Sequence, residues 1–127
     1  CQSMQSTIAL IYVGIGGFFG SICRWSLGSM LKKSLSDPIF PYPTLLINLA
    51  GCLAIGIAYS IWENNNTAKL IIIIGFLGGF TTFSTFGLEL LTLIRAGSLG
   101  MATLYVTLSS CLGIFLVWLG MTIARLN

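Results

Sequence analysis

Glycine, hydroxyl and phenyl side chains crowd the segment "GGFTTFSTF", Gly78 to Phe86, within an otherwise aliphatic run. A phenyl ring has an electropositive edge, so rings beside Thr and Ser hydroxyls could replace the water shell of a small anion. A site without fixed charge holds an ion weakly and releases it quickly, as conduction requires. Phenylalanines 76, 80, 83 and 86 also fall at helical spacing, which is the usual pattern of packing. The segment therefore indicates either an ion site or a packing stripe.

The composition places this segment in a membrane. Of the 127 residues, 56% are hydrophobic and 7% charged, whereas a soluble domain carries about 25% charged residues. A helix needs about 20 mostly apolar residues to cross the hydrocarbon core. The sequence predicts an all-α multi-pass membrane protein with a single domain of four helices, which are expected at Thr7–Leu31, Pro43–Trp62, Ala68–Leu93 and Leu99–Ile123.

The third of these helices is predicted to be broken near residues 78–84. Its two parts, Ala68–Gly79 and Thr85–Leu93, are each too short to span the bilayer. A helix is interrupted at membrane depth only where the freed backbone groups find partners in protein, water or ions. Unwound carbonyls can coordinate a cation there, while the N-terminal end of the next half-helix favours an anion. The alternative is an unbroken helix whose Thr and Ser hydroxyls bond to the preceding turn.

Polar residues also occur inside the second and fourth helices. Asn48 lies one turn after Thr44, so both share a helix face. Asn48 could form a hydrogen bond to another helix, or it could face an ion pathway. In the fourth helix, Tyr105, Ser109 and Gly113 recur at intervals of four residues and form a narrow stripe of two hydroxyls and a gap.

Two charged residues, Arg24 and Glu89, fall within the predicted spans. Arg24 lies near the end of the first helix, where it could extend to the headgroups or attract anions. Glu89 could be interfacial or pair with a cation. The chain has no His, carboxylate pair, Cys/His metal cluster or P-loop, which argues against an enzyme and against a pump driven by ATP.

The loop charges predict a weak preference for one orientation. Lys69 and Arg125 lie on one side of a four-helix zigzag, and Lys32, Lys33 and Arg95 lie on the other. Because Lys and Arg in short loops set orientation, this near balance predicts a weak preference that would allow insertion both ways, although counting Arg24 would make the balance four against two. A chain inserted both ways can form an antiparallel homodimer.

The N-terminal segment and two glycine pairs bear on how the helices begin and pack. The first apolar run is long and has no Lys or Arg before it, so it is expected to remain as a helix rather than be cleaved as a signal peptide. Cys1 at the start indicates a processed or tagged terminus. The pairs Gly16–Gly20 and Gly75–Gly79 let helix backbones approach closely, either between two copies or within one chain.

Taken together, these residues resemble the small bacterial fluoride channels of the Fluc or CrcB family. The resemblance covers essentially the whole chain and rests on three motifs, "GIGGFFGSICRW", "PTLLINLAGCLAIG" and "GFLGGFTTFSTFGLEL". It implies a passive, fluoride-selective channel in the cell membrane that lowers cytoplasmic fluoride. The implied partners are fluoride, an identical antiparallel subunit and the lipid bilayer, and nucleic acid is not among them.

The resemblance also implies roles for individual residues. Phe83 and Phe86 match the rings that line two pores in the family. The other implied anion-pathway residues are Asn48, Tyr105, Ser109, Thr82, Ser84, Thr85 and Arg24. A structural Na⁺ on the dimer axis would be held by the backbone carbonyls of Gly78 and Thr81. The chain departs from the family at Ser109, where many members have Asn or His, and at Gly113, where they have a hydroxyl residue.

Two other functions remain as alternatives. A small four-helix multidrug transporter would need a Glu in the first helix, where this chain has Arg24 and no acid. A membrane subunit that only docks a partner through its glycine faces would leave the third-helix pattern unexplained.

Overall fold

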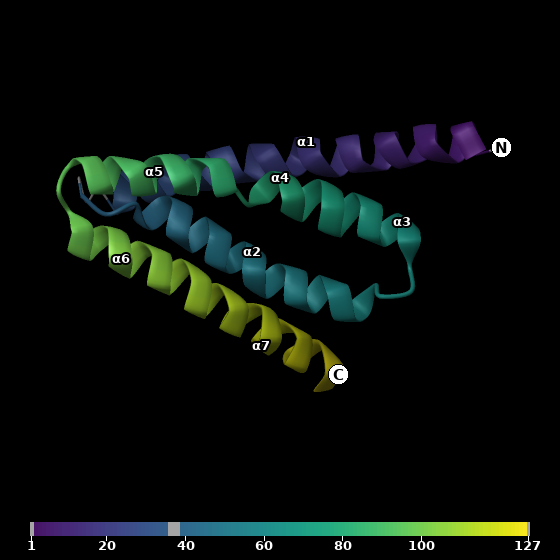
Figure 1. The fold of residues 1–127 in the computed structure, drawn as a ribbon. Helices are drawn as coiled ribbons and strands as arrows, with labels where there is room; N and C mark the ends of the chain where they lie inside the picture. The colour runs from purple at the N-terminus through teal and green to yellow at the C-terminus, as the bar shows by residue number, and fades with distance from the viewer. Residues whose placement is uncertain (1, 36–38, 127) are drawn as a thin grey trace.

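The computed structural model describes residues 2–35 and 39–126, and in these ranges the chain is helical apart from short turns (Figure 1). The elements are α1 (Gln2–Ser34), α2 (Tyr42–Ile61), α3 (Asn66–Ala68), η1 (Lys69–Leu77), α4 (Gly78–Phe80), α5 (Phe83–Arg95), α6 (Leu99–Thr107), η2 (Leu108–Leu112) and α7 (Gly113–Leu126). The two η elements are π-helical.

These elements form four stretches that are long and apolar enough to cross a membrane: Met4–Ser34, Tyr42–Ile61, Asn66–Arg95 and Leu99–Leu126. The third stretch is interrupted between α4 and α5. The prediction of an all-α protein with four spans and a broken third helix is therefore confirmed.

The spans run back and forth, so the connections lie at two ends of the bundle (Figure 1). The start of α1, the α2–α3 connection and the end of α7 lie at one end, and the end of α1, the start of α2 and the α5–α6 turn lie at the other. Gly97 reverses the chain after α5 with a φ of +76°, a conformation that glycine adopts without steric cost. The N–H of Ser98 donates to the carbonyl of Leu93 over 3.0 Å, which closes the end of α5.

Glycines set the distance between α1 and the first half of the third span. Gly16 and Gly20 of α1 are buried; Gly16 faces Gly75, and Gly20 faces the backbone of Phe76. A Cβ added to Gly75 would lie 3.0 Å from the Cα of Gly16, and one added to Gly79 would lie 2.7 Å from a carbonyl oxygen of α1. Such close backbone approach is what small residues permit in membranes. Glycines of both pairs thus bring the two helices close together within one chain, with Gly16 against Gly75 and Gly79 against Gly17.

The outer surface of the bundle suits a lipid environment. Large apolar side chains such as Leu10, Trp25 and Ile114 are exposed, as expected where the solvent is hydrocarbon. Exposed threonines bond to the carbonyl four residues earlier over 2.8–2.9 Å, which satisfies their hydroxyls within the helix; these are Thr92, Thr103, Thr107 and Thr122.

Candidate ion site at the break in the third span

The break consists of two threonines in extended conformation. Thr81 has φ −86° and ψ 157°, and Thr82 has φ −146° and ψ 120°. Both residues are β-branched, which favours extended backbone. Gly78 is still helical, with φ −62° and ψ −39°. The break is thus narrower than the predicted range of 78–84, and the threonines open the helix rather than the glycines.

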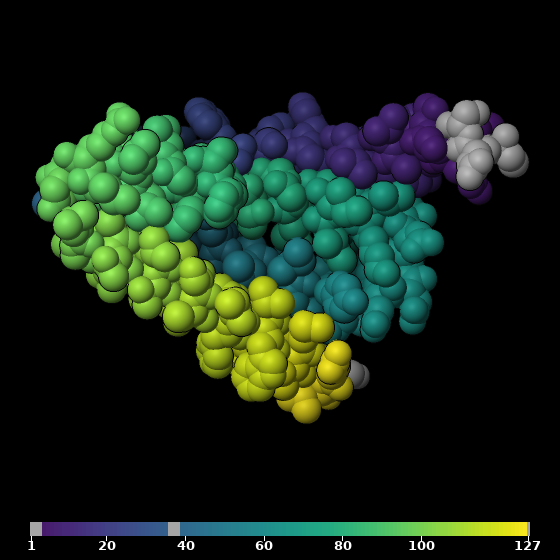
Figure 2. Space-filling model, in the orientation of Figure 1, coloured from purple at the N-terminus to yellow at the C-terminus, as the bar shows by residue number. Residues whose placement is uncertain are grey.

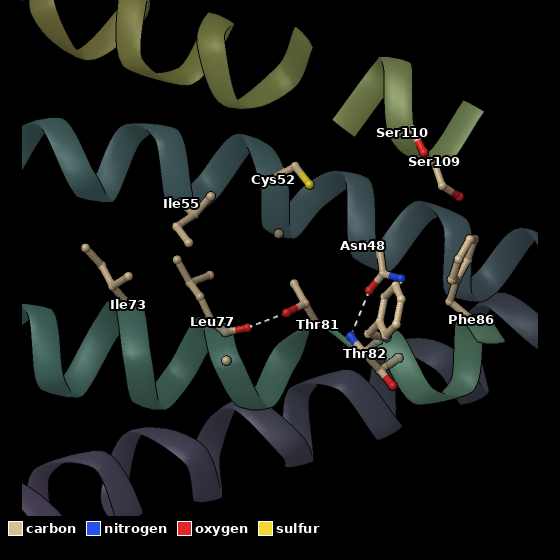
Figure 3. Close-up of a pocket in the computed structure, with 13 residues that line it drawn as sticks. Asn48, Cys52, Ile55, Ile73, Leu77, Thr81, Thr82, Phe86, Ser109 and Ser110 are labelled. Carbon is tan, nitrogen blue, oxygen red and sulfur yellow. Dashed lines mark hydrogen bonds between the residues drawn. The ribbon is translucent and has the colours of Figure 1, made fainter. Parts of the chain in front are cut away.

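A side chain of α2 binds the backbone of the break. The N–H of Thr82 donates to Oδ1 of Asn48 over 2.9 Å, and Nδ2 of Asn48 donates to the carbonyl of Thr82 over 3.0 Å. Figure 3 shows Asn48 facing Thr82 across the gap between α2 and the third span. One amide side chain therefore satisfies both backbone groups of Thr82, so the predicted hydrogen bond from Asn48 to another helix is present.

The side chain of Thr82 begins the second half-helix. Its Oγ1 accepts a hydrogen bond from the N–H of Thr85 over 3.3 Å and donates to the Thr85 hydroxyl over 3.1 Å. This is the arrangement of a helix N-cap. The positive end of the α5 dipole therefore lies at the break, where it favours an anion.

The same hydrogen bonds leave two carbonyls without their helical donors. In an uninterrupted helix, the N–H of Thr82 would bond to Gly78 and the N–H of Thr85 would bond to Thr81. Here Asn48 takes the first of these donors and the Thr82 hydroxyl takes the second. The carbonyl oxygens of Gly78 and Thr81, the two predicted Na⁺ ligands, therefore lack the donors that a continuous helix would give them.

A cleft of about 390 Å³ opens beside the break. Figure 2 shows the hollow between the third span and α2. Its lining residues are Asn48, Gly51, Cys52, Ile55, Ile73, Leu77, Gly78, Thr81, Thr82, Phe83, Phe86, Ser109 and Ser110. No Lys, Arg, Asp or Glu is among these residues, so the cleft carries hydroxyl, amide and carbonyl groups but no fixed charge.

The break also divides the phenylalanine stripe into two pairs. Phe83 and Phe86 lie at the cleft with ring centroids 5.7 Å apart and a tilt of 34°. Phe76 and Phe80 stack at 6.1 Å in the first half of the span. The side chain of Phe83 is 85% exposed in the single chain. The four rings predicted at helical spacing therefore do not form one stripe, because the extended threonines separate them.

In the fourth span, the polar stripe is only partly at the cleft. Ser109 lines the cleft, and its buried hydroxyl is the one buried side-chain polar atom without a partner among the described side chains, those of residues 4–35 and 39–126. Gly113 is instead buried against Cys52, whose sulfur would lie 3.4 Å from an added Cβ. The π-helical turn η2 spans this region and changes the four-residue register, so Ser110 lines the cleft as well.

Tyr105, the first residue of that stripe, does not line the cleft and binds Glu89. Its side chain is 0% exposed, and its hydroxyl donates to Oε2 of Glu89 over 2.8 Å. Thr44 donates to Oε1 over 2.7 Å. The ring of Tyr105 packs on Phe86 with a centroid distance of 4.9 Å, which links this carboxylate cluster to the cleft.

The structure thus brings together only part of the predicted anion pathway. Asn48, Thr82, Phe83, Phe86 and Ser109 line the cleft, whereas Arg24, Ser84, Thr85 and Tyr105 lie outside its lining. The half-buried Arg24 lies on α1. No group of three His, Cys, Asp or Glu side chains that could hold a metal ion occurs in the described part of the chain, so a cation at the break would have oxygen ligands from carbonyls and hydroxyls.

These features define a class of protein. The chain is a multi-pass membrane protein, and broken helices that expose backbone groups beside a polar cleft are typical of membrane proteins with an ion site at membrane depth.

Comparison with known proteins identifies the family. Residues 11–121 match the family described as CrcB-like protein, Camphor Resistance (CrcB). A protein of Methylobacillus flagellatus is 36% identical over 93% of this chain and 95% of its own length. A protein of Nitratidesulfovibrio vulgaris is 39% identical over 91% and 96%, and one of Bacteroides fragilis is 40% identical over 87% and 91%. All three relatives are named fluoride-specific ion channel FluC. The chain belongs to the CrcB family.

Proposed function

We propose that this protein is a fluoride-selective channel that lets fluoride leave the cell passively across the cell membrane. The observation that carries the proposal is the uncharged cleft in which the rings of Phe83 and Phe86 lie beside hydroxyl groups and the N-terminus of α5. Ring edges, hydroxyl protons and a helix dipole attract an anion without a full positive charge. The names of the relatives support fluoride as that anion.

The working form is an antiparallel homodimer. Several polar groups near the middle of the third span are open in the single chain: Gly78 and Ser84 are exposed, and the carbonyls of Gly78 and Thr81 have lost their helical donors. Lipid offers such groups no partner, and each costs several kcal/mol there. A second copy placed over the break would cover them. The same copy would cover Phe83 and complete the walls of the cleft.

A sodium ion at the break fits the groups that are present. The carbonyls of Gly78 and Thr81 are neutral oxygen ligands, which a hard cation prefers. Two copies related by a two-fold axis would supply four such oxygens, and the bound ion would join the two breaks. The chain's own part is to keep these carbonyls out of the helical hydrogen-bond ladder, as the contacts of Thr82 do.

Efflux from proteoliposomes tests the channel. Purified protein should release fluoride down its gradient and leave chloride inside. Equal movement of chloride would refute fluoride selectivity, and no flux of either ion would favour a membrane subunit that only docks a partner.

A further inference from the structure

Asn48 binds one of the backbone donors that a continuous helix would use at the break. In a continuous helix, the N–H of Thr82 would donate to the Gly78 carbonyl. Here it donates to Oδ1 of Asn48 over 2.9 Å. The return bond from Nδ2 to the Thr82 carbonyl, at 3.0 Å, fixes the amide in this orientation. The break is thus held open from α2.

Gly51 gives α2 a second contact with the break. It is buried and lies three residues after Asn48, on the same helix face. A Cβ added to Gly51 would overlap the methyl group of Thr81, so α2 approaches the extended residues as closely as a glycine allows. Asn48 is therefore presented to Thr82 by a tightly packed backbone.

We propose that Asn48 is a positioning residue for the cation site: by holding the N–H of Thr82, it keeps the carbonyl of Gly78 free for the ion. This inference rests on the proposed sodium site and adds a role for a side chain that would not touch the ion. Asn48 has a second Nδ2 hydrogen, which remains for an anion in the cleft. The same amide can thus serve both ions, and its two roles are separable by experiment.

This role requires a hydrogen-bond acceptor in the side chain at position 48. An acceptor for the Thr82 N–H is required, whereas the donor to the Thr82 carbonyl only orients the amide. In Asn48→Ala the Thr82 N–H loses its partner, and the Gly78 carbonyl is the acceptor that a helix would offer it. In Asn48→Asp the acceptor is kept.

The experiment measures the thermal unfolding of the purified full-length protein in detergent as NaCl replaces N-methylglucamine chloride. The readout is the Na⁺ concentration that gives half of the total stabilisation. Asn48→Ala should raise this concentration by about 10- to 100-fold, the usual effect of removing a group that positions metal ligands. Asn48→Asp should not raise it, because the acceptor for the Thr82 N–H is kept and the added negative charge favours a nearby cation. Thr44→Val is the matched control, because it removes another hydrogen bond from α2 to the third span one turn away from Asn48. It should lower the unfolding temperature but leave the Na⁺ concentration unchanged.

The outcomes separate this inference from the proposals on which it depends. If Asn48→Ala keeps the wild-type Na⁺ dependence and only loses fluoride flux, Asn48 serves the anion alone and the inference is wrong. If Asn48→Ala does not fold, loss of the Na⁺ dependence in Asn48→Asp overturns it equally. If the wild-type protein itself shows no stabilisation by Na⁺, the sodium site fails and the inference fails with it, while fluoride efflux tests the channel independently.

Discussion

Replacing Tyr105 by Phe should destabilise the protein through one hydrogen bond. The ring contacts with Phe40 and Phe86 are kept, and only the hydroxyl that donates to Glu89 over 2.8 Å is lost. Hydrogen bonds to charged groups contribute about 1.5–3 kcal/mol, whereas bonds between membrane helices average about 0.6 and reach about 1.7 kcal/mol. Tyr105 is 0% exposed, and Glu89 keeps Thr44 as a donor in the variant. We therefore expect the free energy of unfolding to fall by about 1.5 kcal/mol. Reversible unfolding in mixed micelles measures this change.

Tyr59→Phe is the matched control, since Tyr59 is 43% exposed and should lose less than about 0.5 kcal/mol. The reasoning is refuted if Tyr105→Phe costs no more than this control. Thr44→Val supplies a further check, because Thr44 donates to the other oxygen of the same carboxylate. In the double variant of Thr44→Val and Tyr105→Phe, the Glu89 carboxylate has neither hydroxyl donor. Its free energy of unfolding should therefore fall by about 1 kcal/mol more than the sum of the two single losses. Strict additivity would show that the two hydroxyls do not share one acceptor.

Three other predictions concern the pore, the topology and the packing. Phe83→Ile and Phe86→Ile should each reduce fluoride efflux by about tenfold, the factor that corresponds to about 1.4 kcal/mol in the barrier. Both variants should still elute as dimers from a sizing column. Unchanged efflux in both would show that the ring edges do not bind the anion. Reporters fused to the C-terminus should be found on both sides of the membrane, and a single orientation would contradict dual topology. Gly20→Ala should destabilise the fold by about 1–3 kcal/mol, because its Cβ would overlap the Phe76 carbonyl. Gly14→Ala meets nothing within 4 Å and should be neutral or stabilising, so equal losses at both positions would be inconsistent with this packing.

The spans and the break were predictable because they depend on local sequence. Four apolar stretches separated by charged residues suffice to place four helices, and polar residues at membrane depth already indicate an interruption. The position of the break was predicted less well. Glycine is the residue usually associated with helix breaks, but Gly78 is helical and the β-branched pair Thr81 and Thr82 is extended. Here the deciding factor is an acceptor on another helix, Asn48, which no local pattern contains.

The partners of Glu89 could not be predicted for the same reason. Thr44 and Tyr105 lie 45 and 16 residues away from it in the chain, and only the packing of α2, α5 and α6 brings the three together. The sequence did give one clue, because Thr44 and Asn48 share a face of α2 and both bind the third span. Tyr105 and Ser109 were expected on one stripe, but the π-helical turn η2 alters the register between them and Gly113.

The distribution of charge within the spans fits a chain that works in both orientations. Apart from residues near the span ends, the only charged side chains in the described spans are Arg24 and Glu89. Both precede the same end of the bundle: α1 ends at Ser34 and α5 at Arg95, and both helices end on that side (Figure 1). At 1.5 Å per residue, Glu89 lies roughly 9 Å and the break roughly 20 Å before the end of α5. Within its spans, one chain thus carries Arg24 and Glu89 in the same half of the bundle and no charge at the break. In the proposed antiparallel dimer, each membrane face would receive the charged half of one copy, and the uncharged break of both copies would occupy the middle. An anion would then meet the same kinds of groups from either side, and no fixed charge at the break would delay its release.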